Sequence, residues 1–110
     1  MVELCKNGFF ARVLNEDGFV RVQLVLIESE QESIRASFPC SVGSLSAVLS
    51  GATLLLSDVK DCYLLITPDP NGIHVGFASN HLERADACIV TREDYSDMIT
   101  IVSVPSRRNR

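Results

Sequence analysis

The segment Asn15–Phe19, NEDGF, decides the fold, and Asp69–Ile73, DPNGI, repeats its pattern. Each segment begins with a side-chain acceptor, has Asp or Asn third and glycine fourth, and ends on an apolar residue. This order suits a type I turn closed by a glycine in the left-handed region, the usual three-residue hairpin connection. Because β-type residues flank both segments, we expect two antiparallel hairpins.

The expected turn geometry sets which side chains share a face of each hairpin. In the first hairpin Asn15 would lie opposite Phe19, and Val13 opposite Arg21. One face would then be apolar except for an arginine and would carry Phe10, Arg12, Leu14, Val20, Val22, Leu24 and Leu26. In the second hairpin, Leu64 and Ile66 would lie beside the small residues of residues 74–78 and leave a shallow groove.

Further strands and one helix follow from the remaining pattern. Residues 33–39 alternate, with Ile34 among the inward positions, and residues 52–56, 87–91 and 98–104 also read as strands. Residues 44–50 predict a short helix, with Ser44 as its N-cap and Gly51 at its end. The sequence therefore predicts a mainly β protein (all-β to α+β) of seven or eight short strands, an antiparallel sandwich or a partly open barrel.

The domain organisation is simple. A chain of 110 residues is long enough for one independent core, which we assign to residues 1–104. Residues 105–110 are polar and basic and predict a disordered tail. A shift of 54 residues superimposes the two turns but little beyond them, which favours recurrence of a common turn over internal duplication.

Charge and hydropathy narrow the functional class. The chain has 14 acidic and 10 Lys or Arg residues, giving a net charge of −4, and its mean hydropathy is +0.19. An acidic body repels a phosphate backbone, which disfavours nucleic acid as a partner. No apolar run is long enough for a membrane span, and no signal peptide is evident, so we expect a cytoplasmic protein.

The cysteines and histidines give no sign of a catalytic or metal site. The four cysteines are widely spaced, which predicts reduced structural thiols. No nucleophile elbow, phosphate loop or metal-ligand spacing occurs, and His74 and His81 are isolated. We therefore expect no catalytic residue, no metal and no cofactor, and a small enzyme of unknown reaction is the third alternative.

The leading hypothesis is a non-enzymatic protein-binding module, an adaptor, inhibitor or immunity-type neutraliser, which forms a homodimer. The alternative is a small β-barrel that binds single-stranded nucleic acid by stacking bases on Phe side chains beside Arg in the first hairpin. The candidate partner-binding residues are Phe9, Phe19, Arg12, Arg21, Glu28, Glu30 and Glu32. The candidate dimer contact is Val25, Leu26 and Ile27, or the expected strand 98–104.

Overall fold

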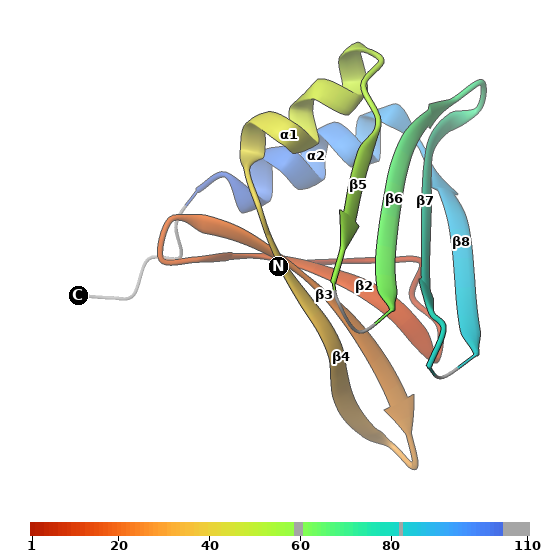
Figure 1. Ribbon diagram of the computed structural model, residues 1–110. Helices are drawn as coiled ribbons and strands as arrows, with labels where there is room; N and C mark the ends of the chain where they lie inside the picture. Colours follow the sequence, from red (N-terminus) through yellow and green to blue (C-terminus); the bar gives the residue numbers. More distant parts are fainter. Residues whose placement is uncertain (59–60, 82, 105–110) are drawn as a thin grey trace.

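The computed structural model describes residues 1–58, 61–81 and 83–104, which form two antiparallel four-stranded sheets (Figure 1). The first sheet contains β1 (Val2–Leu4), β2 (Phe9–Glu16), β3 (Phe19–Glu28) and β4 (Gln31–Cys40), and α1 (Val42–Ala47) and the 3-10 turn η1 (Val48–Ser50) follow it. The second contains β5 (Leu54–Ser57), β6 (Cys62–Asp69), β7 (Gly72–Ser79) and β8 (Arg84–Val90), and α2 (Arg92–Val102) follows it. The mainly β class, the strand number and the helix near residues 44–50 are confirmed.

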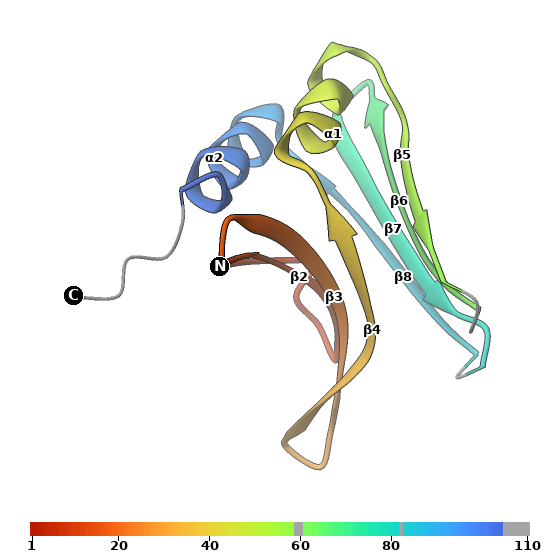
Figure 2. The same ribbon diagram turned by 60° about the vertical axis from the view of Figure 1, so that its left-hand side comes forward.

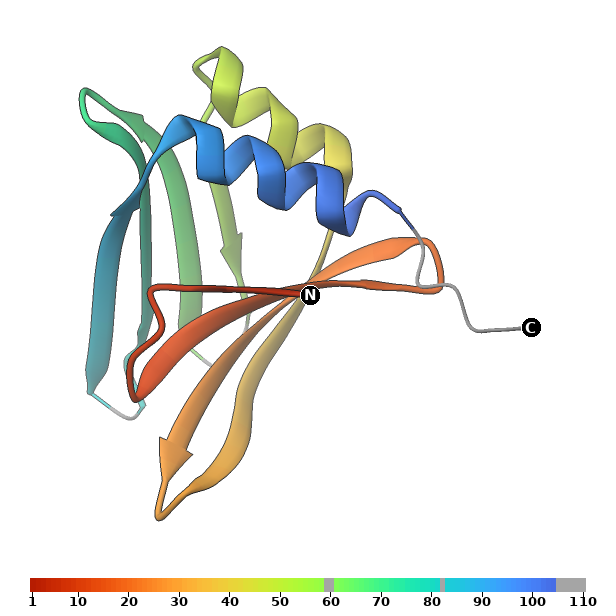
Figure 3. The ribbon, with the colours of Figure 1, turned by 180° about the vertical axis from the view of Figure 1, so that it is seen from behind.

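The two sheets form a wedge that the helices close at one end. Their inner faces look toward each other, and α1 and α2 lie side by side across the end where the sheets approach them (Figures 1 and 3). Away from the helices, β4 diverges from the strands of the second sheet (Figure 2). Four strands followed by a helix occur twice in the chain, once for each sheet.

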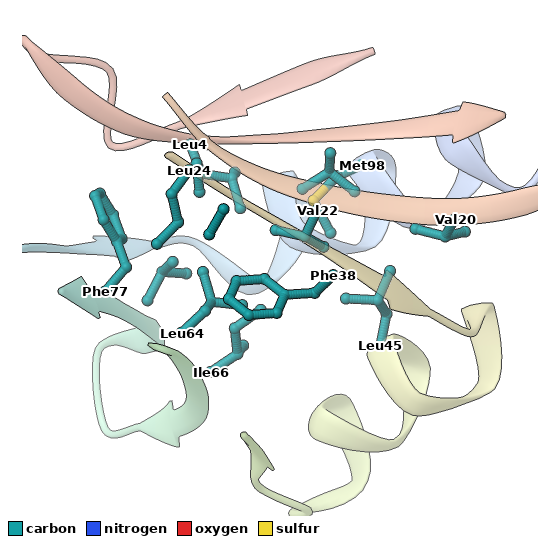
Figure 4. Close-up of a cluster of buried hydrophobic side chains, with 14 of the residues drawn as sticks. Leu4, Val20, Val22, Leu24, Phe38, Leu45, Leu64, Ile66, Phe77 and Met98 are labelled. Atoms are coloured by element: carbon teal, nitrogen blue, oxygen red, sulfur yellow. The ribbon is translucent and has the colours of Figure 1, made fainter. Parts of the chain in front are cut away.

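The core lies between the sheets and under the helices (Figure 4). The rings of Phe9 and Phe77 meet across the two sheets, edge to face, with centroids 5.1 Å apart. The helices contribute Leu45, Met98 and Tyr95, all of them buried. Burial of this apolar surface is the main force that holds the two sheets together.

The register of the first hairpin differs from the prediction by one residue. Glu16 pairs with Phe19 and Val13 with Val22, so the loop contains only Asp17 and Gly18. Both loop residues have positive φ, 55° and 90°, as a two-residue type I′ turn requires. Because Asp17 adopts the left-handed conformation, the predicted face was wrong: the inner face carries Phe9, Ala11, Val13, Val20, Val22, Leu24 and Leu26.

The second hairpin shows the same one-residue difference. Ile66 pairs with Val75 and Leu64 with Phe77, and all of these side chains are buried. The predicted pairing of large with small residues on this face was therefore wrong. Large side chains fill the inner face because the tight turn brings Asp69 opposite Gly72.

Residues 92–102 form a helix, where the prediction had an acidic loop followed by a strand. The Thr91 hydroxyl caps the helix by accepting a hydrogen bond from the Asp94 amide at 3.0 Å, and acidic residues in the first turn complement the helix dipole. Tyr95, Met98 and Val102 recur at helical spacing and face the core. The short helix α1 also has a different cap from the predicted Ser44, because Ser41 accepts the Ser44 amide at 3.0 Å.

Cys5 and Cys88 form a disulfide, so the expectation of four reduced cysteines was wrong. The loop between β1 and β2 packs against β8, where the Asn7 amide also donates to Asp86 at 3.3 Å. This contact brings together cysteines that are 83 residues apart in the sequence, with Cα atoms 5.4 Å apart. Cys40 and Cys62 are free.

Tyr95 joins the two helices, and its replacement by phenylalanine tests this link. The buried hydroxyl donates a hydrogen bond to the Leu45 carbonyl at 2.7 Å. Tyr95→Phe leaves that carbonyl without its donor, so we expect the free energy of unfolding to fall by about 1–3 kcal/mol. Urea unfolding of the variant and of the wild type measures this loss, and equal midpoints would contradict it.

The same side chain predicts a loss of stability at alkaline pH. Burial, and secondarily the nearby Cys40, raise the pKa of Tyr95 above its usual value. Above a pH of about 10 the unfolded chain releases the phenolic proton while the folded protein keeps it, so the free energy of unfolding falls as pH rises. Urea titrations across this pH range should show a shallower fall for Tyr95→Phe, and equal slopes for the two proteins would contradict the assignment.

Candidate functional site

The outer face of the first sheet is covered by charged side chains that pair with each other. Arg12 bridges two carboxylates, with its Nη2 atom 3.0 Å from Glu3 Oε2 and 2.8 Å from Glu32 Oε2. Lys6 also pairs with Glu3, at 2.7 Å. Hydrogen bonds from Lys6 and then Arg12 hold the pKa of Glu3 below its ordinary value. This face is polar and its charges are satisfied within the chain.

Basic side chains also shield the aromatic ring on that face. Phe10 lies on the outer side of β2 and is fully buried, with Lys6 Nζ 5.0 Å and the Arg12 guanidinium carbon 5.5 Å from its ring centroid. These distances suit cation–π contacts. The ring is therefore packed beneath charged groups and does not form a stacking platform.

The outer face of the second sheet is different, because among the described residues its strands place only one charged side chain there, Asp69, at the turn end of β6. Large apolar side chains project from it, with Leu55, Tyr63 and Ile89 exposed by 61%, 40% and 46%. Small residues lie between them, since Leu65 pairs with Gly76 and Gly76 with Ala87. We call this surface the second-sheet face; it consists of Leu55, Ser57, Tyr63, Leu65, Thr67, His74, Gly76, Ala78, Ala85, Ala87 and Ile89.

Regular pairing explains why these residues share one surface. Successive side chains of a strand point to opposite faces, so the buried Leu64 and Ile66 alternate with the outward Tyr63 and Leu65. The strands have 4, 8, 8 and 7 residues, and at about 3.4 Å per residue and about 4.8 Å between strands they give this face an area of roughly 450 Å². The surface is large enough to seat the face of another sheet.

The structure separates the residues predicted to bind a partner. Phe9 is buried in the core, whereas Phe19 is 74% exposed at the tip of the first hairpin. Arg12 lies in the ion-pair network, and Arg21 pairs with Glu16 at 2.9 Å. Phe9 is therefore not available for the base stacking that the nucleic-acid alternative requires, because the register places it on the inner face, and of these two rings only Phe19 is exposed.

The predicted dimer contact lies mostly inside the chain. Val25 and Leu26 are buried, and Ile27 is partly exposed. Val25 packs on the outer side of the first sheet opposite Phe10, and Leu26 faces the core. The apolar run at the end of β3 is thus explained by packing within one molecule.

The predicted acidic residues occupy the turn between β3 and β4. Glu28 and Glu30 are exposed there, and Ser29 and Glu30 have positive φ, 53° and 63°. Glu32 lies just beyond the turn and pairs with Arg12. Only part of the predicted acidic surface is therefore available to a basic partner.

Within the part of the chain that the structure describes, no cluster of His, Cys, Asp or Glu could hold a metal ion. None of the described helices has the length and apolar character needed to cross a membrane. The chain matches no protein-family model, no curated protein sequence and no solved structure. The functional argument therefore depends on the surfaces themselves.

The sequence did not lead us to expect an exposed apolar surface at Leu55, Tyr63 and Ile89. The alternation in β6 was visible in the sequence, but the one-residue error in register placed Tyr63 and Leu65 beside Val75 and Phe77. With the observed pairing the same residues define an outward surface. The alternation of side chains in β6 was therefore visible in the sequence, but the length of the turn determined which strand residues they lie beside.

Proposed function

We propose that this protein is a non-enzymatic protein-binding module that recognises the apolar face of another β-sheet. The second-sheet face carries the proposal, since Leu55, Tyr63 and Ile89 project from it, Asp69 at its end is the one charged residue beside it, and neither of the described helices covers it. Contiguous exposed apolar surface on a folded protein marks interaction sites. The charged and internally paired outer face of the first sheet offers a direct contrast within the same molecule.

A second copy of the chain is the first partner to test. Two such faces stacked together would bury roughly 900 Å² in total, which is below the size of a standard stable interface. We therefore expect weak self-association, with a dissociation constant above roughly 1 µM. A stronger complex would need a partner that also contacts the rim of the face.

A pair of matched lysine substitutions tests the surface. Ile89→Lys introduces a charge at the edge of the second-sheet face, and Ile101→Lys introduces the same change on α2, where Ile101 is 54% exposed. We expect Ile89→Lys to weaken self-association at least tenfold, because the interface would bury an unpaired ammonium group. Sedimentation velocity over a wide concentration range, up to millimolar, measures the constants.

The same variants identify a different partner if the chain is monomeric. We would immobilise the wild type and the two variants, Ile89→Lys and Ile101→Lys, and identify the lysate proteins that bind to each of them. Partners of the second-sheet face are retained by the wild type and by Ile101→Lys, and are lost with Ile89→Lys. A strictly monomeric wild type that shows no such difference would overturn the proposal.

A further inference from the structure

The two halves of the chain, residues 1–51 and residues 52–104, share one architecture. In the part of the chain that the structure describes, each half forms a four-stranded antiparallel sheet followed by a helix. The second and third strands of both halves are joined by a two-residue loop, and β2 and β6 have eight residues each. Residues buried in the first hairpin have buried counterparts 53 positions further on in the second: Phe9 and Cys62, Ala11 and Leu64, Val13 and Ile66, Val20 and Ile73, Val22 and Val75, and Leu24 and Phe77.

The last strand and the helix of each half correspond in the same way. Phe38 and Cys88 pair with equivalent residues of β3 and β7. Ser41 and Thr91 cap α1 and α2, and each accepts a hydrogen bond from the amide three residues further on, at 3.0 Å. Buried side chains follow at equal distances from the two caps: Leu45 and Val48 in the first half, and Tyr95 and Met98 in the second.

Unequal strand lengths hid this correspondence in the sequence. β3 and β4 have ten residues each, whereas β7 and β8 have eight and seven. The offset between the halves falls from 53 positions in the hairpins to 50 at the helix caps, so no single shift aligns them. β4 also contains a bulge opposite Leu24 and Val25, and Ile34 lies on the outer side with 54% exposure, in contrast to its predicted inward position. The structure thus favours internal duplication over the recurrence of a common turn.

Each half helps to cover the apolar face of the other. The 3-10 turn η1 of the first half contacts β6, and α2 of the second half contacts β1 and β2 as well as its own β7 (Figure 3). Two hydrogen bonds join the halves at the helices. The Tyr95 hydroxyl donates to the Leu45 carbonyl at 2.7 Å, and the Asn15 side-chain amide donates to the Val102 carbonyl at 2.8 Å. Neither half therefore buries its inner face without the other.

A short segment connects the halves. Residues 51–53 lie between η1 and β5 and belong to no strand or helix. Gly51 has a φ of 107°, which other residues rarely adopt, and its amide donates to the Val48 carbonyl at 3.0 Å. This left-handed turn leads the chain from η1 into β5, so that the second half folds back onto the first. An extended backbone at residues 51–53 would carry the second half away from the first.

We propose that the interface between the halves also forms between two copies of the chain, so that the first half of each copy pairs with the second half of the other. Such an exchanged dimer keeps the contacts between the halves and changes only the hinge at residues 51–53. The closed monomer prevails in dilute solution, because linked halves meet at an effective concentration of roughly 1 mM. The second-sheet face stays on the outside in both forms, so this proposal is independent of the proposed function.

The disulfide reports which halves are paired. Cys5 belongs to the first half and Cys88 to the second, so their bond lies within one chain in the monomer and joins two chains in the exchanged dimer. The full-length protein is unfolded in urea with dithiothreitol, refolded without reductant at about 10 µM and about 1 mM, and treated with oxidised glutathione. The two thiols lose two protons and two electrons as the S–S bond forms, and one oxidised glutathione is reduced to two glutathione molecules. We expect a covalent dimer on a non-reducing gel at the higher concentration, with only Cys5–Cys88 bridges in its peptide map.

Two glycine-to-valine variants test the hinge. Gly51→Val strains the left-handed turn of the closed monomer, and a β-branched residue favours the extended backbone of the exchanged form. Gly18→Val is the matched control, because Gly18 has a φ of 90° in a hairpin loop, and a Cβ atom at either glycine would meet no atom within 4 Å. We expect Gly51→Val to raise the equilibrium constant for the exchanged dimer at least tenfold above that of Gly18→Val, since exchange relieves strain at the hinge alone.

Three outcomes would overturn the proposal. The first is the absence of a dimer with Cys5–Cys88 bridges between chains when the wild type is refolded at about 1 mM, a result that does not depend on whether Gly51→Val folds. The second is an equal amount of this dimer in Gly51→Val and Gly18→Val. The third is its loss in Ile89→Lys, which would show that the second-sheet face brings the chains together. Exchange of halves predicts the same covalent dimer in Ile89→Lys as in the wild type.

Discussion

Replacing both Cys5 and Cys88 with alanine lowers the free energy of unfolding by roughly 2–5 kcal/mol, the largest single loss that we expect from this structure. The cross-link spans 83 residues of sequence, so it restricts most of the unfolded chain. It also holds the loop after β1 against β8 and thus connects the two sheets along one side. Guanidinium or urea unfolding of the double variant measures the loss.

A reducing agent and a free cysteine provide the controls for this experiment. Dithiothreitol should shift the unfolding midpoint of the wild type toward that of the double variant and leave the double variant unchanged. Cys40→Ala changes a half-buried thiol without a disulfide and should cost less than about 1 kcal/mol. A wild-type midpoint that does not respond to reduction would contradict the assigned role of the bond.

Gly72→Ala lowers the free energy of unfolding by about 3 kcal/mol or more, because two penalties act at one position. Gly72 has a φ of 148°, a conformation that other residues rarely adopt. A Cβ atom at this position would meet the Val90 carbonyl oxygen at a distance far below van der Waals contact. Since Val90 belongs to the neighbouring strand β8, relief of the clash requires a shift of sheet backbone.

Gly8→Ala is the matched control for Gly72→Ala. The nearest atom to a Cβ at Gly8 is Arg84 Nη2 at 3.8 Å, an ordinary contact with a flexible side chain. Its backbone has no positive φ, so we expect a change of less than about 1 kcal/mol. Urea midpoints of the two variants should differ clearly, and equal values would show that β7 and β8 can separate at little cost.

Much of the architecture was predictable, because glycine-containing turns and alternating strands carry strong local signals. The positions of both hairpins follow from Gly18 and Gly72. The registers were harder to predict, and in the first hairpin the choice between a two-residue and a three-residue loop depended on whether Asp17 adopts a left-handed conformation. A difference of one residue exchanges the two faces of a strand, so a small error in the turn displaced the whole candidate surface.

The helix α2 and the disulfide escaped prediction for different reasons. The β-branched residues at the end of α2 favour strands, and burial of Tyr95, Met98 and Val102 overrides that preference. The Thr91 cap was a helix signal that the sequence already contained. The disulfide depends on how β1 and β8 meet in space, which no local pattern encodes.

The position of α2 has a consequence for how the protein is made. This helix comes last among the described elements, yet it packs on β1, β2 and β7, and its Val102 carbonyl accepts a hydrogen bond from Asn15. A nascent chain on the ribosome can therefore pair its early strands, but part of their apolar side stays uncovered until α2 emerges. We expect the unfinished first sheet to be a natural client for chaperones during synthesis.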